Sequence, residues 1–246
     1  MMRRMSDGPS APPLRRLIDE ALAAPPHRLR FAQALESRFE ADTAAARTRH
    51  LVLMSIIGTV LFMGFLISDA SLIPDVFPEA LLLRGLSGPC ALALVILVLN
   101  RTEDPRTREL APMLLALSGE VVIIVLFLST RSPDRATYLD GTTLVLLYSN
   151  VVVQARFPYA SGCTLLAGVA ILVGLALAHG VSLPVRQSHV AVLTTVSTLT
   201  LITNFRLERR DRRNYLMGLR EALRNEDLAS SNQMRKRRDV STAVFR

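Results

Sequence analysis

Six long apolar blocks constrain this sequence more than any other feature. They cover about residues 51–68, 81–99, 111–129, 138–153, 159–179 and 188–205. Each is close to the roughly 20 residues that an α-helix needs to cross the hydrocarbon core of a bilayer. The apolar residues are continuous rather than alternating, which argues against β-barrel strands. The sequence therefore predicts an all-α, polytopic membrane protein with a bundle of six transmembrane helices, of which the fourth is the shortest and most polar.

Arginine residues near the block ends predict how the chain is oriented. One side of the membrane carries eleven of them, namely Arg47, Arg49, Arg101, Arg106, Arg108, Arg156, Arg206, Arg209, Arg210, Arg212 and Arg213. The other side carries three, namely Arg131, Arg135 and Arg186. Because cytoplasmic loops are rich in Lys and Arg, both termini are predicted to be cytoplasmic. This topology also explains the net charge of +8, so nucleic acid is not expected as a partner.

The predicted organisation has four parts. Residues 1–50 form a cytoplasmic N-terminal region, and residues 51–205 form the transmembrane domain in the lipid bilayer. Residues 206–233 form a cytoplasmic connector helix, and residues 234–246 form a divergent tail. After Pro184 the chain has no proline, and its one glycine is Gly218. The sixth span is therefore expected to continue as one long exit helix from about 188 to about 230.

Two amphipathic helices are predicted within the N-terminal region. Leu14, Leu17, Ile18, Ala21 and Leu22 repeat at helical spacing, and Phe31, Leu35 and Phe39 follow four residues apart. Such helices lie on the membrane surface, on the bundle or on a partner subunit, and the pattern does not separate these alternatives.

Four residues inside the blocks form a candidate intramembrane polar site: Glu120, Arg84, Tyr148 and Asn150. Charges within a bilayer are costly and usually face the bundle interior or a wet cavity. Glu120, in LLALSGEVVIIVLFL, is the clearest case. Arg84, near the outer end of the second span, either snorkels to the headgroups or has a functional role. Glu120 and Asn150 either belong to a functional polar site or only form hydrogen bonds between neighbouring helices.

The sequence contains no motif that predicts catalysis. We find no Gly-rich phosphate loop, no paired-His motif and no nucleophile elbow. Cys90 and Cys163 fall inside apolar blocks and are expected to be buried thiols without a metal. No catalytic residue, metal or cofactor is therefore predicted, and the chain is not expected to be an enzyme.

The connector has an apolar seam. Leu216, Leu219 and Leu223 repeat at a 3–4 spacing, and the seam extends back to Phe205 through two arginines. A seam that includes arginines predicts a weak coiled coil. We therefore expect a homodimer that forms through the connector helix. In such a dimer Phe205, Leu216, Leu219 and Leu223 would transmit a signal along the helix.

The connector run FRLERRDRRNYLMGLREALRNEDLASSNQ resembles the segment between the membrane domain and the catalytic domain of GGDEF-type diguanylate cyclases. LRFAQALESRFEADTAAARTRHLV and SDASLIPDVF resemble segments around the first span of that family. The resemblance covers about residues 28–233. It implies a sensor of cyclic di-GMP signalling in the bacterial inner membrane, for a small-molecule ligand that the sequence does not identify.

The resemblance stops where the catalytic domain would begin. The chain reads MRKRRDVSTAVFR instead of the entry motif and GGDEF loop of the family. This departure predicts a frameshifted or truncated product without cyclase activity. Two other functions stay open: a small transporter or channel subunit that uses Glu120, and a membrane scaffold that binds partners through its cytoplasmic ends. The long exit helix favours the sensor or the scaffold.

Overall fold

The computed structural model describes residues 14–25 and 29–244, with side chains as far as Gln233. Every regular element in these ranges is a helix, which confirms the predicted all-α class. Five helical stretches are long and apolar enough to cross a membrane: Gln33–Leu72, Pro74–Arg101, Pro105–Ser129, Phe157–Leu177 and Leu183–Gln233.

The chain divides into two compact units. The larger one is Thr43–Glu208, which includes the whole predicted transmembrane region 51–205, and is called the bundle unit below. The smaller one combines Met1–Asp42 with Arg209–Arg246 and is called the terminal unit, of which only the described residues are discussed. Two helices contribute to both units, since α2 and α9 each cross a boundary between them.

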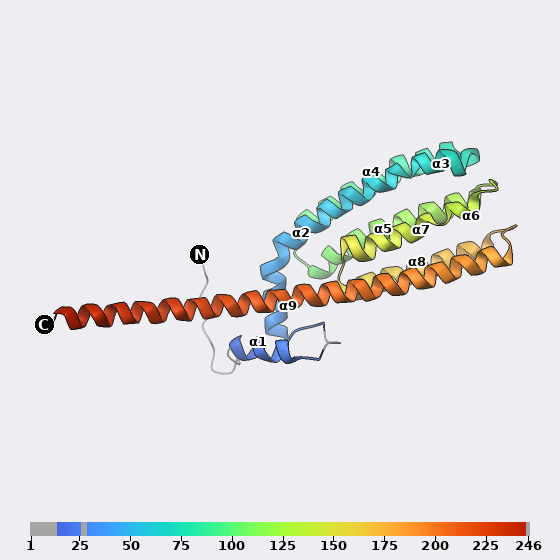
Figure 1. Ribbon diagram of the computed structural model, residues 1–246. Coiled ribbons are helices and arrows are strands. Elements are labelled where there is room, and N and C mark those ends of the chain that lie inside the picture. The colour runs from blue at the N-terminus through green and yellow to red at the C-terminus, as the bar shows by residue number, and fades with distance from the viewer. Residues whose placement is uncertain (1–13, 26–28, 245–246) are drawn as a thin grey trace. The chain divides into compact units, whose positions relative to one another are not determined.

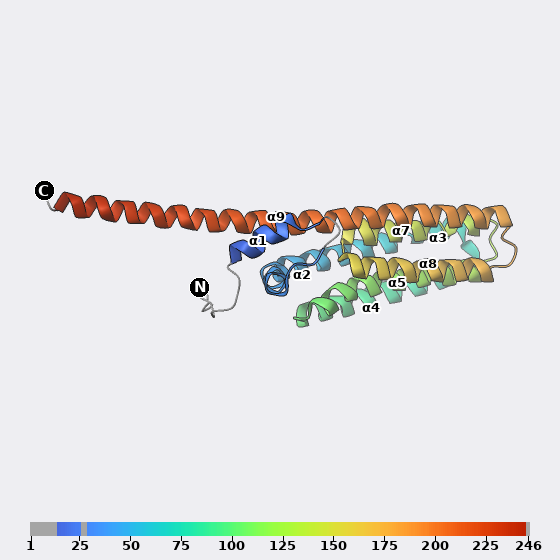
Figure 2. The same ribbon diagram turned by 90° about the horizontal axis from the view of Figure 1, so that it is seen from below.

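The elements follow one another as a series of antiparallel passes. Figures 1 and 2 show the helices of the bundle unit running side by side, and α5 packs against both α4 and α8. In chain order the elements are α1 (Leu14–Ala23), α2 (Gln33–Gly64), α3 (Leu66–Leu72), η1 (Pro74–Val76), α4 (Phe77–Arg101), α5 (Pro105–Ser129), α6 (Arg135–Tyr138), α7 (Gly141–Leu147), η2 (Tyr148–Val153), α8 (Phe157–Leu177) and α9 (Leu183–Val244).

Local sequence sets the helix starts. Asp104 caps α5, because its carboxylate accepts hydrogen bonds from the backbone N–H groups of Arg106 (3.3 Å) and Thr107 (2.9 Å). A hydrogen bond from the Thr107 hydroxyl, assisted by these backbone bonds, holds the pKa of Asp104 below its usual value. Pro105 follows at the first helical position, where its missing N–H costs nothing. Gly180, with a φ of +77°, makes the turn before α9.

The outward faces of the long helices are apolar. Leu82, Leu114 and Leu165 have exposed fractions of 65%, 62% and 68%. An apolar surface that covers helix after helix is stable in lipid and not in water. The chain is therefore a membrane protein. Cys90 also lies on this exposed surface, so the expectation that both thiols are buried holds only for Cys163.

The interior of the bundle unit contains two apolar clusters. One includes Ile123 and Leu126 of α5 and Leu139. The other includes Met113 of α5 and Val153 of η2. The buried positions between them on the same helices include polar residues, namely Glu120 on α5, Asn150 on η2 and Thr164 on α8. The two clusters also meet directly, because Leu117 packs against both.

The block at 138–153 differs from the single helix that the sequence predicts. A turn at Asp140 separates α6 from α7, and α7 continues into the π-helix η2. The segment nevertheless runs the length of the bundle unit. Tyr138 accepts a hydrogen bond from Arg84 at the end where α3 stops, whereas the Arg156 N–H donates to Glu109 at the start of α5. The segment thus returns the chain from one end of the unit to the other.

The predicted exit helix is longer than expected. It was predicted over about 188–230, and α9 extends from Leu183 to Val244 without a break. The predicted tail at 234–246 is thus helical as far as Val244, and its last two residues lie outside the described part. Towards the N-terminus, α1 confirms the first amphipathic helix. The second predicted amphipathic segment and the first span form the single helix α2.

Arg84 does not snorkel. Its side chain is fully buried, and its Nε lies 2.6 Å from Asp69 Oδ2. Its Nη2 donates to Asp69 Oδ1 (3.2 Å) and to the Tyr138 hydroxyl (2.8 Å), and its Nη1 donates to the Phe62 carbonyl (3.3 Å). The guanidinium also lies 4.4 Å from the centre of the Phe62 ring. This ion pair joins α3 to α4 and holds the hairpin between them closed.

Asp69→Leu should strongly destabilise the bundle, because it leaves the Arg84 charge buried without its partner. Breaking a buried ion pair from one side costs about 3–5 kcal/mol. The midpoint of thermal unfolding in detergent should fall, and Asp69→Leu combined with Arg84→Leu should recover much of the loss. The control is Asp211→Leu in the exposed pair Arg210–Asp211, which should have little effect. A native midpoint for Asp69→Leu would contradict a structural role for the pair.

Candidate functional site

The π-helix η2 is the most unusual backbone feature of the bundle unit. It spans Tyr148–Val153, and Gln154 after it has a left-handed backbone with a φ of 53°. A π-helix is rare and is often found at functional sites, because it removes carbonyl groups from the regular hydrogen-bond ladder. A non-glycine residue in the left-handed region is also uncommon. Side chains of three other helices hold this segment in place.

Asn204 of α9 binds the backbone on both sides of Gln154. Its Nδ2 donates to the carbonyl oxygens of Asn150 (2.8 Å) and Ala155 (3.0 Å). Asn204 is 1% exposed, so these bonds form without competition from water. The position of α9 is therefore linked directly to the backbone of η2.

The side chain of Asn150 joins η2 to two further helices. Its Nδ2 lies 2.9 Å from the hydroxyl oxygen of Thr164 on α8 and 2.9 Å from that of Thr200 on α9. The Thr164 hydroxyl donates back to the Asn150 Oδ1 at 3.1 Å. Asn150 is fully buried. This amide therefore bonds neighbouring helices, which was one of its two predicted roles, and it does so at the junction of α8, α9 and η2.

Residues of α2 bind the remaining carbonyl groups at the end of η2. Arg47 Nη2 donates to the Gln154 carbonyl at 2.6 Å, and His50 Nε2 lies 3.2 Å from the Val153 carbonyl oxygen. Arg47 also makes a bidentate pair with Glu109, with both distances at 2.8 Å. The Glu109 carboxylate is fully buried and also accepts from the Arg156 N–H at 2.9 Å. An ionic cluster thus fixes the turn between η2 and α8.

Two further contacts connect this turn to α9. The Phe157 N–H, at the start of α8, donates to Glu208 Oε2 at 2.6 Å. A carboxylate at a helix N-terminus is favoured both by its free N–H groups and by the helix dipole. The rings of Phe157 and Phe205 meet edge to face, with centroids 5.4 Å apart. Phe205, predicted to lie on the connector seam, therefore packs within the bundle unit.

Tyr148, at the start of η2, contacts α2. Its hydroxyl donates to the Met54 carbonyl at 2.7 Å. A Cβ atom placed on Gly58 would lie 2.8 Å from a ring carbon of Tyr148, so only glycine allows this approach. Tyr148 and Asn150 therefore belong to one site, with contacts to α2, α8 and α9.

Glu120 has no described hydrogen bond to Arg84 or to the other residues of the predicted polar site. It is 2% exposed, which agrees with the expected interior position, and the structure describes no hydrogen-bond partner for either carboxyl oxygen. An ionised carboxylate at such a position would cost several kcal/mol. Of the four residues predicted as one polar site, the structure joins only Tyr148 and Asn150, through η2, and Arg84 bonds elsewhere.

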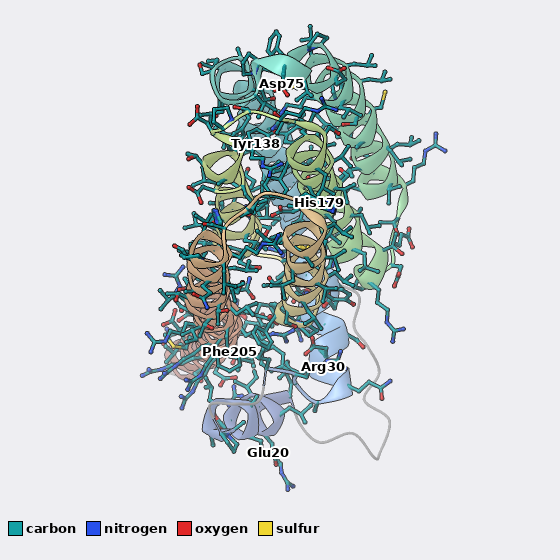
Figure 3. The ribbon with its side chains drawn as sticks, turned by 90° about the vertical axis from the view of Figure 1, so that its right-hand side faces the viewer. Glu20, Arg30, Asp75, Tyr138, His179 and Phe205 are labelled. Atoms are coloured by element: carbon teal, nitrogen blue, oxygen red, sulfur yellow. The ribbon has the colours of Figure 1, made fainter. Side chains whose placement is uncertain are left out.

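The end of the bundle unit near the turns at Pro74 and Thr130 holds a second group of polar residues. Figure 3 looks along the helices from this end, where Asp75, Tyr138 and His179 are labelled. Asp75 accepts from the Thr130 hydroxyl (2.6 Å) and the Arg131 N–H (2.7 Å), and so fixes the turn after α5. Asp140 lies 3.4 Å from Nδ1 of His189 on α9.

Sequence reasoning missed Asp69 and Glu109, the two buried acids that pair with arginines. Asp69 falls just beyond the predicted first span (51–68) and Glu109 just before the predicted third span (111–129), so neither was included in the predicted polar site. A signal existed for Asp69, because it and Arg84 flank the turn at Pro74 on consecutive helices, where antiparallel neighbours can meet. Thr164 and Thr200 carried no such signal, since threonine is common in membrane helices and often bonds its own backbone.

In the terminal unit, Arg212 of α9 is the central contact. Its guanidinium binds Glu36 in a bidentate pair at 2.8–3.0 Å and lies 4.9 Å from the centre of the Phe39 ring. Tyr215 donates to Asp42 at 2.7 Å and packs on Phe39. Leu35 and Phe39 are buried here. Of the alternatives for this predicted amphipathic segment, the structure shows packing against the chain's own helices.

The predicted connector seam is only partly accessible. Leu216 is 2% exposed, whereas Leu219 and Leu223 are partly buried. Leu216 lies beside Leu22, Leu29 and Phe31 in one small cavity of the terminal unit.

Groups of residues that could hold a metal ion are absent from the described part of the chain, where no three His, Cys, Asp or Glu side chains converge. The buried polar groups described above are instead bonded mostly to backbone carbonyls and to each other. This arrangement suits a mechanical junction between helices.

Comparison with known proteins identifies the family. No curated protein and no solved structure is significantly similar to the chain. The model of the MASE8 family matches residues 67–224, which is more than half of the chain. The matched region begins in α3, includes the whole of η2 and extends into the part of α9 that carries Arg212. The chain belongs to MASE8, a family of membrane-associated sensor domains.

Proposed function

We propose that this chain is the sensory domain of a cyclic di-GMP signalling protein, anchored in a bacterial inner membrane. In this proposal a change within the bundle unit is passed through α9 to a diguanylate cyclase domain, and the chain itself performs no catalysis. Membership of a membrane-associated sensor family supports the sensory role. The resemblance of the run that follows Asn204 to a cyclase connector supports the output.

One observation carries the proposal: α9 is bonded to η2 and continues without interruption as far as Val244. A segment with two alternative backbone arrangements can act as a switch, and a π-helix can rearrange to an α-helix by moving its carbonyl groups. Asn204 holds one of these carbonyl groups, that of Asn150, and also the carbonyl of Ala155 just after the segment. A rearrangement of η2 would therefore push or rotate α9. A stimulus can drive this change only if it binds the two arrangements with different affinity.

Dimerisation through the connector remains part of the proposal. Leu219 and Leu223 are accessible enough to contact a second copy, and Met217 is 45% exposed on the same helix. Leu216, by contrast, is covered within its own chain. The proposed dimer therefore uses the C-terminal part of the seam.

A second function, proton- or ion-coupled transport, is favoured by one observation. Both carboxyl oxygens of Glu120 lack a described partner although the side chain is buried. Intramembrane ionisable residues often mark ion or proton pathways. The Glu120 variants below distinguish this alternative, since a transporter would lose proton uptake in liposomes and a sensor would lose its output.

Reporter fusions should place both termini in the cytoplasm. Fusions at residue 20, at residue 155 and after residue 225 are expected inside, and fusions within 70–79 or 131–134 are expected outside. The reason is the arginine excess at one side together with the return of the chain through 138–153. An outside signal at residue 155 would show that this segment does not cross, leaving five spans.

Asn204→Leu should uncouple the bundle from its output. In a chimera that carries an active cyclase domain after the connector, the variant should change cyclic di-GMP production at least about fivefold, the lower range of allosteric coupling. The control is Thr203→Val on the exposed face of the same helix turn. Equal output from both variants would contradict a role for the bond between α9 and η2.

Glu120→Gln and Glu120→Leu should both change the output of this chimera if the carboxyl group serves signalling. Glu120→Gln should leave the midpoint of thermal unfolding close to that of the native protein. If Glu120 is only a structural cost, Glu120→Leu should raise the midpoint by several degrees, because an unpartnered buried polar group costs about 1–3 kcal/mol. Val121→Leu, at an exposed neighbouring position, is the control. Native behaviour in both assays would exclude either role.

A further inference from the structure

Two cavities adjoin each other in the bundle unit. The first, with a volume of about 340 Å³, lies between α2, α5, α7 and η2. The second, of about 520 Å³, lies nearer the end with the turns at Pro74 and Thr130, between α3, α5, α7 and α9. Phe65 and Leu144 line both cavities. The two cavities therefore adjoin at these residues, and they are treated below as the inner part and the outer part of one groove.

The inner part is apolar. Four hydroxyl groups line it. Those of Thr59, Ser118 and Tyr148 each donate to a backbone carbonyl oxygen at 2.7–2.9 Å, whereas the buried Ser55 Oγ has no described partner. Three of the four hydroxyls are thus already bonded, so the cavity presents mainly carbon surface. At about 30 Å³ for each water-sized group, the volume holds roughly ten such groups. This size fits a medium-length alkyl chain.

The outer part is polar. Ser68, Thr137, Asp140 and Thr143 line it, and the Asp140 side chain is 62% exposed. Arg84 also contributes to the wall, but Asp69, Tyr138 and the Phe62 carbonyl bind its guanidinium from every donor nitrogen. The accessible charge is therefore the negative charge of Asp140, which stays exposed although its Oδ1 lies 3.4 Å from His189 Nδ1. A cationic head group is favoured here over a carboxylate.

The groove is open towards the surrounding lipid. Leu144, which lines both parts, is 55% exposed, and Leu61 at the edge of the inner part is 53% exposed. Both belong to outward-facing apolar surface. A molecule dissolved in the bilayer can therefore enter from the side, tail first, without passing through water.

We propose that this groove binds a single-chain amphiphile with an amine or ammonium head. The alkyl tail occupies the inner part, and the head lies beside Asp140. This inference rests on the proposed sensory function, for which it supplies the chemical class of the stimulus. Tyr148 and Val153 of η2 line the inner part, so an occupied groove contacts the segment that holds α9. Ligand binding and movement of α9 thereby share one element.

The test uses the full chain in lipid nanodiscs and two photoreactive probes, a ten-carbon alkylamine and the carboxylic acid of the same length. Cross-linked residues are mapped by mass spectrometry. The amine should label the helices around the inner part about tenfold more efficiently than the acid, a factor that corresponds to one favourable charge contact. Label should be confined to α2, α5, α7 and η2.

Three variants sharpen the assignment. Leu144→Trp fills the junction of the two parts and should reduce labelling about tenfold, since the tail can no longer enter. Leu165→Trp, on the exposed face of α8 and outside both cavities, is the matched control and should label normally. Asp140→Asn should abolish the preference for the amine over the acid while labelling of the inner part continues.

Each result decides something. Equal labelling of every lipid-facing helix by both probes, or normal labelling of Leu144→Trp, would mean partition into the bilayer only and would overturn the proposal. A preference for the acid would overturn the choice of head group. Because binding is measured without an output domain, its failure is distinct from failure of the sensory function. Specific binding with unchanged output of the cyclase chimera would keep the groove and refute the sensor.

Discussion

A membrane offers no water to a buried polar group, so each such group has to be satisfied within the protein. Most features of the bundle unit follow from this constraint. Arg84 and Asp69 neutralise each other at one end, and Arg47 neutralises Glu109 at the other. Between them, two apolar clusters supply the packing that lipid cannot drive, since helix association in membranes depends on close contact and internal hydrogen bonds. The ion pairs fix which helices meet and how far along its length each helix contacts its neighbour.

The same constraint explains why η2 is bonded so extensively to other helices. A π-helix and a left-handed Gln154 expose carbonyl groups, and in lipid these require partners from other helices. Asn204, Arg47 and His50 are those partners. These carbonyl partners come from α2 and α9, the two helices that contribute to both units of the chain. A change in the backbone of this short segment therefore alters hydrogen bonds to both helices at once.

The sequence predicts those features that depend on local pattern. Length and hydropathy are properties of each block alone, so the five long helices were expected, and helical spacing from Leu14 to Leu22 predicted α1. The 138–153 block was predicted less well, because its π-helix is stabilised by Asn204, Arg47 and His50, which are distant in sequence. Pairing of Asp69 with Arg84 likewise depends on how two helices dock. A polar residue within a span indicates that a partner is needed to offset the free-energy cost of burial in lipid. Which residue serves as that partner depends on the fold.

The terminal unit shows how packing limits the way in which α9 can be used. The predicted dimer seam includes Leu216 and, as one of its two arginines, Arg212. In the structure Arg212 instead pairs with Glu36 and lies over the Phe39 ring. Leu216 is buried within the same chain. Two partners cannot occupy one face of a helix. A connector dimer that included Leu216 would have to displace the chain's own N-terminal segment and break the bidentate pair of Arg212. A dimer that begins beyond Leu216 keeps both contacts, so the covered face sets where along α9 a second copy can first pack.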